Sequence, residues 1–380
     1  MKALVFILLG GLMIGTTLPG IAGQNVFVFI GTYTGSKSKG IYRSSFDAVT
    51  GKLTAPELAI ETENPSFLTM HPNGRYLYAV GETSDFGNKG SGSVSAYALD
   101  SASGKLSFLA RQSSGGGGPC HLSIDHSGKW LFVANYGAGS IAILPIRPDG
   151  GLGEATAVLQ HKGAGANPQR QEGPHAHFIT ADPGNRFVLA CDLGLDKVLI
   201  YRLDPQAGSL TVNDPPDLSV APASGPRHLA FHPSGRFVYL INELNSTLSA
   251  LRYDPQRGEL REVQTVSTLP PDFKGNNSCA EVQVHSSGRF VYGSNRGDNS
   301  LAVFMAEPKT GRLTLVQHQS TQGKTPRYFG IDPTGQWLLA CNQDSDSIAI
   351  FRIDPRTGRL TATGQTVSVG APVCLAWVSP

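Results

Sequence analysis

The sequence predicts an all-β protein, a seven-bladed β-propeller with four antiparallel strands in each blade and a last blade closed by the N- and C-terminal strands. Three observations predict this fold. Glycine (45 residues) and proline (25 residues) are abundant, while charged residues make up only 16% of the chain, which is typical of a protein dense in turns and poor in helix surface. The other two observations are two different turns that recur along the chain.

The first recurrent turn has an acidic residue, a glycine four positions later and a leucine two positions after that, as in Asp47 to Leu53. A shortened copy, Asp149 to Leu152, fills the one large gap between the others. The turn glycines are on average about 51 residues apart, a period found among propeller blades. We assign them to positions 51, 104, 151, 208, 258, 311 and 358, which gives seven units.

The second recurrent turn, such as His232 to Arg236, ends in glycine and a basic or polar residue and lies between two β-type runs. It occurs six times and not seven. The run Val26 to Ile30 corresponds to strand two of a unit, and the run Val373 to Trp377 corresponds to strand one. We therefore expect these terminal runs to pair in one blade, which closes the ring and leaves no sheet edge open.

The N-terminal segment differs from everything after it. Lys2 is followed by an apolar run to about Thr17 and then by small residues at Gly20, Ala22 and Gly23. This order is typical of a signal peptide, and the apolar run is short for a membrane span. The sequence predicts a signal peptide over residues 1–23, a propeller domain over 24–380, and an exported protein, periplasmic or secreted, with no membrane attachment after cleavage.

Charge and cysteine content exclude some classes of partner. Because 31 basic residues balance 29 acidic ones without a run of five like charges, nothing indicates binding to nucleic acid. The five cysteines are an odd number without close spacing, so we expect buried free thiols. Cys191 and Cys341 occupy equivalent strand positions in blades that are not neighbours, and should not be bonded to each other.

The first strand of each propeller blade lines the central channel, so equivalent residues of the seven units should meet at its mouth. Positions held for packing alone would be apolar and similar, whereas these differ in charge. Their charges indicate a polar site that binds an anion and moves protons. One set is Ser66, Cys120, His177, Arg227, Ala280, Arg327 and Val373, and the next is Phe67, His121, Phe178, His228, Glu281, Tyr328 and Cys374.

A third set lies at the end of strand two. Asparagines recur there in four units, and we expect them mainly to cap local backbone. Glu243 and Arg296, which follow this position, appear once each and are either functional or a structural ion pair between neighbouring blades. From the three sets and from His175, two residues before His177, we take as candidate substrate contacts His121, Asn135, His175, Asp192, His228, Glu281 and Arg327.

The segment His175-Ala176-His177 places two imidazoles two residues apart on one strand. This spacing is compatible with a metal ligand pair, a catalytic or substrate-binding histidine, or structural histidines. Because no third ligand at a recognised spacing accompanies them, we expect no metal. The sequence also lacks a Gly-x-Ser-x-Gly elbow, a P-loop and a His-Glu-x-x-His motif, which argues against a serine hydrolase and a nucleotide-binding enzyme.

Several of these segments resemble one known family. They are Gly118-Pro119-Cys120-His121, Ala134-Asn135-Tyr136-Gly137, Gly173 to His177, Gly225-Pro226-Arg227-His228, Asn242-Glu243-Leu244 and Ser294-Asn295-Arg296-Gly297. Together they resemble the seven-bladed-propeller lactonase family, which includes bacterial 6-phosphogluconolactonase and fungal carboxymuconate cyclase. The resemblance covers nearly all of the chain after the signal peptide. It implies a catalytic site made of His177 or His175, Arg227, Glu243 and Arg296.

The resemblance implies hydrolysis of a sugar lactone, as in 6-phosphogluconolactonase, by water attack at the channel mouth without a metal or organic cofactor. We expect Glu243 or the channel histidine to act as the base, Arg227 to stabilise the oxyanion, and Arg296 to hold a phosphate or carboxylate of an anionic small-molecule substrate. The alternatives are a lactone-forming cyclase of the carboxymuconate type, and a non-catalytic exported propeller that binds protein or glycan. The sequence leaves the oligomeric state open.

Overall fold

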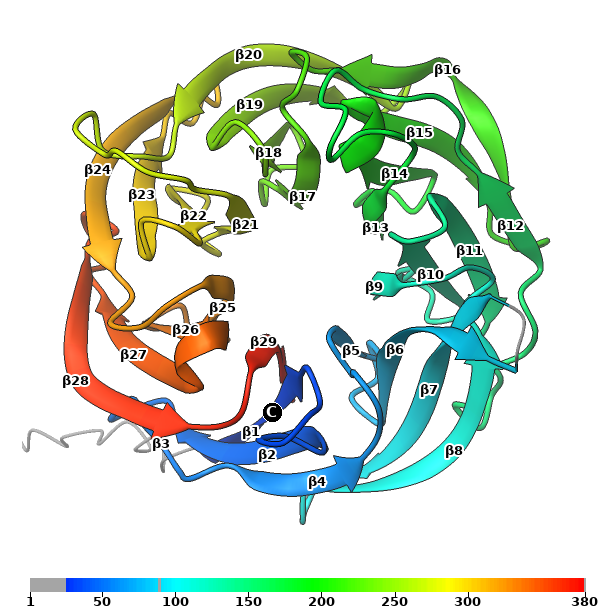
Figure 1. Cartoon of the computed structure of the whole chain (residues 1–380), viewed down its shortest axis with the longest axis horizontal. Coiled ribbons are helices and arrows are strands. Elements are labelled where there is room, and N and C mark those ends of the chain that lie inside the picture. The colour runs from blue at the N-terminus through cyan, green and yellow to red at the C-terminus, as the bar shows by residue number, and fades with distance from the viewer. Residues whose placement is uncertain (1–24, 88–89, 379–380) are drawn as a thin grey trace, which may run out of the picture.

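The computed structural model describes residues 25–87 and 90–378. These residues form seven antiparallel sheets arranged in a ring (Figure 1), which confirms the predicted seven-bladed β-propeller. The segment expected to be the signal peptide, residues 1–23, lies outside the described residues. In the described part of the chain, no helix is long and apolar enough to cross a membrane.

The blades follow one another in sequence order around the ring. Blade one comprises β5 (Leu68–Met70), β6 (Tyr76–Phe86), β7 (Ser91–Asp100) and β8 (Lys105–Ser113). Blade two comprises β9 (Pro119–Ile124), β10 (Trp130–Asn135), β11 (Ser140–Pro145) and β12 (Ala157–Gln160). Blade three comprises β13 (Ala176–Ala181), β14 (Phe187–Asp192), the 3₁₀ turn η1 (Leu193–Leu195), β15 (Lys197–Asp204) and β16 (Ser209–Ser219).

Blade four comprises β17 (Pro226–Phe231), β18 (Phe237–Asn242), β19 (Thr247–Asp254) and β20 (Glu259–Ser267). Blade five comprises β21 (Cys279–Val284), β22 (Phe290–Asn295), β23 (Ser300–Ala306) and β24 (Leu313–Ser320). Blade six comprises β25 (Pro326–Ile331), β26 (Trp337–Asn342), the 3₁₀ turn η2 (Gln343–Ser345), β27 (Ser347–Ile353) and β28 (Leu360–Ser368).

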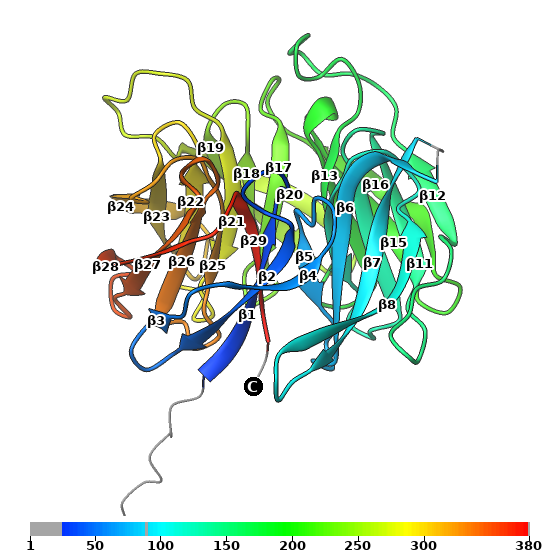
Figure 2. The same ribbon diagram turned by 60° about the horizontal axis from the view of Figure 1, so that its bottom comes forward.

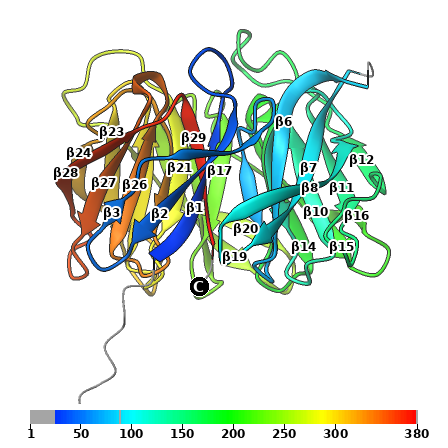
Figure 3. The ribbon, with the colours of Figure 1, turned by 90° about the horizontal axis from the view of Figure 1, so that it is seen from below.

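Blade seven is built from both ends of the chain, as the missing tight turn predicts. Its inner strand β29 (Pro372–Trp377) pairs antiparallel with β1 (Asn25–Thr32), with Val28 opposite Trp377. The sheet continues with β2 (Gly40–Asp47), whose outer side pairs with the short strands β3 (Lys52–Leu53) and β4 (Glu57–Glu61). The start of β1 and the end of β29 lie at one face of the disc, and the β1–β2, β12–β13 and β20–β21 loops rise from the other (Figures 2 and 3).

The hydrophobic cores lie between neighbouring blades. One core joins Phe132 and Ile143 of blade two to Ile179 and Tyr201 of blade three, and similar clusters join the other neighbouring blades. A single blade therefore cannot bury its apolar faces alone, and stability depends on the complete ring. All five cysteines are free and buried, which confirms the expectation for the thiols, including Cys191 and Cys341.

An aromatic residue at or near the start of each strand two packs on the turn glycine of the following blade. This contact repeats around the whole ring, and all seven glycines have a positive φ, which residues with a Cβ rarely adopt. In blade two the glycine is Gly150 (φ 83°) and not Gly151, which corrects our sequence assignment of the shortened turn. The pairs are Phe27–Gly104, Tyr76–Gly150, Trp130–Gly208, Phe187–Gly258, Phe237–Gly311, Phe290–Gly358 and Trp337–Gly51.

This contact gives a stability prediction with a matched control. A Cβ at Gly208 (φ 62°) would lie 2.2 Å from the Trp130 ring, whereas a Cβ at Gly235 (φ 66°) would meet no atom within 4 Å. Both alanine variants carry a left-handed backbone cost of about 1–2 kcal/mol. Gly208→Ala should lose about 1–3 kcal/mol more, because the ring must move. Urea unfolding measures the loss of unfolding free energy in both variants. Equal losses would contradict a stabilising contact between Trp130 and Gly208.

Candidate active site at the channel mouth

In five blades a β-bulge at the start of the inner strand directs one side chain into the channel mouth. In β13 the residues on either side of His177 pair with β14, whereas His177 has no partner in the ladder. Arg227 in β17 and Arg327 in β25 are the extra residues at the same position of their blades. Cys120 and Val373 repeat the pattern in blades two and seven. Because a bulge re-aims the side chain it carries, these residues face the channel and not an inter-blade core.

The ends of the second strands supply the other side chains of the mouth. Tyr33, Tyr136, Glu243 and Arg296 each follow the last residue of such a strand, and Glu82 holds the same position within the longer β6. Four of these residues and three of the bulged ones line a polar cavity of about 280 Å³, whereas Tyr33, Arg227 and Val373 line a smaller pocket beside it. The cavity is lined by Glu82, Cys120, Tyr136, Arg170, His177, Glu243, Ser278, Arg296 and Arg327.

Glu243 is the centre of a charge cluster formed with three arginines. Its Oε2 accepts hydrogen bonds from Arg227 Nε at 3.0 Å and lies 2.7 Å from Arg296 Nη2. Its Oε1 accepts from Arg170 Nη2 at 2.7 Å. Burial alone would raise the pKa of Glu243, but the charges of Arg296 and Arg227 outweigh it and hold this pKa far below the ordinary value. Glu243 is therefore an ionised, weakly basic carboxylate.

Arg227 and Arg296 bind backbone on the far side of this cluster. Arg227 Nη1 donates to the Ala280 carbonyl at 2.8 Å, and Arg296 Nη2 donates to the Cys279 carbonyl at 2.9 Å. Burial, and then the nearby charges of Arg296 and Arg327, lower the pKa of Arg227 to about 10, so this guanidinium stays charged at neutral pH. The Nε–H of Arg296 is buried without a hydrogen-bond partner in the described residues.

His177 lies beside this cluster as a neutral imidazole. Burial and the nearby charge of Arg227 lower its pKa well below 6.5, and the negative charge of Glu243 only partly opposes them. Its Nδ1 is 3.7 Å from the Cys120 sulfur, while Nε2 makes no hydrogen bond to the residues that the structure describes. Burial raises the pKa of the Cys120 thiol, so this group is a neutral neighbour and not a thiolate.

A layer of rings closes the channel beneath the cavity. His121 lies between Phe67 and Phe178, with ring centroids 4.2 and 4.1 Å away, and His228 lies 5.3 Å from His121. Arg227 Nη1 is 3.3 Å from His228 Nε2, and an arginine only donates, so Nδ1–H must donate to Glu281 at 2.9 Å. Burial raises the pKa of Glu281 to about 8, so this acid is largely uncharged at neutral pH.

His121, His228 and Glu281, which we expect from the sequence to contact the substrate, lie in or against this floor. His121 is 3% exposed and His228 is 2% exposed. Burial lowers the pKa of His121 to about 3, which keeps its ring neutral. His228 contacts Arg227, His121 and Glu281 contact His228, and none of the three lines the main cavity.

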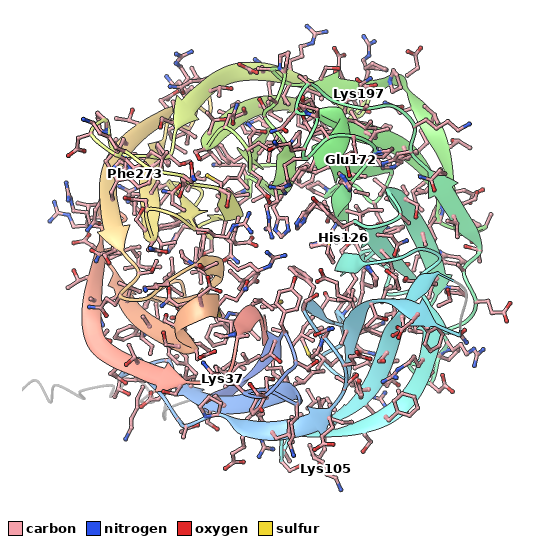
Figure 4. All side chains as sticks on the ribbon, in the orientation of Figure 1. Lys37, Lys105, His126, Glu172, Lys197 and Phe273 are labelled. Carbon is pink, nitrogen blue, oxygen red and sulfur yellow. The ribbon has the colours of Figure 1, made fainter. Side chains whose placement is uncertain are left out.

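Arg170, which our sequence analysis did not identify, comes from the long loop between β12 and β13. The neighbouring residue Gln171 is fully buried and donates to the Leu193 carbonyl and to Asp196, which anchors the loop. Arg170 thereby reaches both Tyr136 and Glu243, at 3.3 and 2.7 Å. In Figure 4 this loop is marked by Glu172, on the channel side of the outer strands of blade three. An arginine in an irregular loop has no repeat position, so the blade alignment carried no signal for it.

The opposite wall of the cavity holds a second polar cluster. Arg327 Nη2 donates to the Tyr33 hydroxyl at 2.9 Å, and the Tyr33 hydroxyl donates to Glu82. Ser66 also donates to Glu82. Tyr33 and Glu82 hold the same register as Arg296 and Glu243, so the repeat alignment contained the signal. Tyr33 was missed because the terminal blade lacks the tight turn on which the alignment rested.

Three other candidate residues lie outside the cavity. Asn135 donates to the Ser114 carbonyl at 3.0 Å and caps local backbone, as expected for the recurring asparagines. Asp192 is fully buried, binds His161 at 2.6 Å and accepts from the His175 backbone N–H. The assignment of Asn135 and Asp192 as substrate contacts is therefore not supported by their positions. Asp192 is bound by neighbouring protein groups, and the amide nitrogen of Asn135 donates to Ser114 and Ser140, whereas Asn135 Oδ1 is buried without a hydrogen-bond partner in the described residues.

His175 lies next to the cavity and supports one of its walls. Its ring stacks on Tyr136 with centroids 4.5 Å apart, and its two nitrogens contact the Tyr136 carbonyl and Glu172. Of the two histidines considered for catalysis, only His177 lines the cavity. In the described ranges, 25–87 and 90–378, no group of three or more His, Cys, Asp or Glu side chains gathers closely enough to hold a metal ion.

The chain matches known proteins over almost the whole propeller. The family described as "Lactonase, 7-bladed beta-propeller" matches residues 27–377. A 6-phosphogluconolactonase of Bacillus subtilis is 40% identical over 350 residues, which cover 92% of this chain and 97% of the relative.

Two solved structures share the whole ring. A periplasmic gluconolactonase of Pseudomonas aeruginosa is 37% identical with a TM-score of 0.88, covering 94% of this chain and 99% of that one. A putative 6-phosphogluconolactonase of Bacteroides fragilis is also 37% identical with a TM-score of 0.88, covering 95% and 100%. With the bulged residues and the Glu243 cluster in place at the channel mouth, the chain belongs to the seven-bladed β-propeller lactonase family.

Proposed function

We propose that this protein hydrolyses an anionic sugar lactone, as a 6-phosphogluconolactonase does, by water attack in the cavity at the channel mouth. The names of its relatives support lactone hydrolysis. The observation that carries the proposal is the neutral His177 beside a carboxylate that three arginines surround. This arrangement supplies a proton acceptor and fixed positive charge within one polar cavity.

His177 is the base in this proposal. A water molecule attacks the lactone carbonyl carbon and gives a proton to Nε2 of His177, the nitrogen without a protein partner. The carbonyl oxygen becomes an oxyanion, which Arg227 and Arg296 stabilise by charge and hydrogen bonding. When the bond between the carbonyl carbon and the ring oxygen breaks, His177 returns the proton to that oxygen. The product is an open-chain hydroxy acid, which ionises in water.

Glu243 assists without accepting the proton. Its pKa is held far below the ordinary value, which makes it a poor base. Its negative charge favours the imidazolium that forms on His177, and it fixes the directions of the three guanidinium groups. Both oxygens of Glu243 are bound by guanidinium groups, whereas Nε2 of His177 has no bond to the described residues, so of the two bases that the sequence left open we propose His177.

We also propose that the enzyme acts outside the cytoplasm. The order of Lys2, the apolar run and the small residues before Gly23 supports export. The P. aeruginosa structure, which is similar over the whole propeller, is of a periplasmic protein. Cell fractionation with an antibody to the propeller tests this proposal.

Removing the His177 ring tests the identity of the base. His177→Ala should lower kcat by about 10²- to 10⁴-fold, the usual contribution of a general base. Added imidazole should restore part of the activity, because the variant leaves space at the cavity wall. His126→Ala, on an exposed turn, is the matched control. Recovery of Glu243→Ala by formate, without recovery of His177→Ala by imidazole, would show that Glu243 is the base.

The pH dependence follows from the lowered pKa of His177. The base is the neutral imidazole, so activity falls only when the pH drops through the pKa of the folded state, which lies well below 6.5. The kcat/KM should therefore stay level from pH 7.5 down to 6.5 and decline only below that. A pH-stat assay corrected for spontaneous lactone opening measures this profile. Half-maximal kcat/KM at or above pH 6.5 would contradict the assignment.

A further inference from the structure

Arg327 differs from the other three arginines at the channel mouth. Arg170, Arg227 and Arg296 each pair with Glu243, within 2.7–3.0 Å. Within the described chain, Arg327 has no carboxylate at ion-pair distance, and its guanidinium has one hydrogen-bond partner, the uncharged Tyr33 hydroxyl. An arginine carries five N–H donors and stays charged. Arg327 therefore faces the cavity with a positive charge and donors that the protein leaves unused.

Tyr33 holds this guanidinium in place. The Arg327 carbon Cζ lies 5.3 Å from the Tyr33 ring centroid, and the Tyr33 hydroxyl accepts from Arg327 at 2.9 Å. The phenol proton is directed to Glu82, whose two oxygens lie 3.1 and 2.9 Å away. Because Glu82 takes that proton, the oxygen lone pair of Tyr33 faces Arg327. The chain of contacts fixes Arg327 without neutralising it.

The charges around the cavity do not cancel. Four arginines, at positions 170, 227, 296 and 327, face two carboxylates, at 82 and 243, which leaves a charge of +2 when His177 is neutral. The third nearby acid, Glu281, is largely uncharged at neutral pH because burial raises its pKa to about 8. A phosphate monoester carries nearly two negative charges at pH 7. The charge of a phosphate monoester therefore balances the excess positive charge of the cavity.

The positive charge of Arg327 lies on the side of the cavity away from His177, the proposed base. Strand β25, which carries Arg327, and β1, which precedes Tyr33, lie across the channel from β13, which carries His177 (Figure 1). A lactone whose carbonyl lies at His177 therefore extends its far end toward Arg327. Arg296, expected from sequence to hold the anion, is already paired with Glu243.

We propose that Arg327, positioned by Tyr33, is the specificity residue that binds a phosphate ester at the end of the substrate remote from the lactone carbonyl. This inference rests on the proposed lactonase activity and adds which residue selects phosphorylated over neutral lactones. The phosphate oxygens accept hydrogen bonds from the unused N–H groups of Arg327. Neutral sugar lactones use the same reacting groups without this contact.

The test compares two substrates on the same variants. For Arg327→Gln, kcat/KM on 6-phosphoglucono-1,5-lactone should fall about 10- to 100-fold, the usual effect of losing a charge-assisted hydrogen bond. On neutral glucono-1,5-lactone it should change less than about threefold, which also shows that the variant is folded. Tyr33→Phe should raise KM for the phosphorylated lactone while kcat stays within about twofold. Arg261→Gln, on the exposed side of β20, is the control. A carboxylate-bearing sugar lactone should show an intermediate loss.

Inorganic phosphate provides a second measurement. It should inhibit hydrolysis of the neutral lactone competitively in the parent enzyme and at least tenfold more weakly in Arg327→Gln. Equal losses on both lactones, or a selective loss in Arg170→Gln and not in Arg327→Gln, would overturn the proposal. If the parent hydrolyses neither lactone, the lactonase proposal fails by itself. Calorimetric titration with phosphate then still decides the Arg327 site, since binding by the parent and not by Arg327→Gln would support it.

Discussion

The pairing of β1 with β29 is the interaction on which the rest of this structure depends. Blade cores form between neighbours, so an open ring would leave two blade faces without a partner. The cavity has the same requirement, because six blades line it and the closing blade supplies Tyr33 and Val373 to the smaller pocket beside it. A few backbone hydrogen bonds between the two ends of the chain thus hold together both the hydrophobic cores and the site.

Burying the charged groups of the cluster at the mouth has a desolvation cost in the free energy of folding. Ion pairs withdrawn from water regain their desolvation cost only when the geometry is good, and an apolar replacement is often as stable. Glu243 is nevertheless surrounded by three arginines at 2.7–3.0 Å, and Arg227 is 2% exposed. We therefore attribute most of the stability of the ring to the inter-blade cores and not to this cluster.

Much of this structure was predictable because the repeats expose the register. The blade number, the closure by terminal strands and the meeting of His177, Arg227, Glu243 and Arg296 all follow from aligning one turn. Prediction of the site residues from the sequence failed where the repeat is interrupted. Arg170 lies in a loop without an equivalent, and Tyr33 lies in the blade that lacks the aligned turn. Asp192 shares the register of the recurring asparagines, but its side chain caps backbone groups of a 3₁₀ turn, and register alone does not say whether a polar group faces the channel or the backbone.

The bulge at the start of five inner strands separates the residues that bind substrate from those that hold the fold. The bulged side chain faces the channel, while its neighbours along the strand keep their ladder partners. An exchange at such a position therefore alters what the cavity binds with little disturbance of the packing beneath it. Blades two and seven carry the small side chains of Cys120 and Val373 there. These two places are where new substrate preferences can arise, by natural selection or by design, without rebuilding the ring.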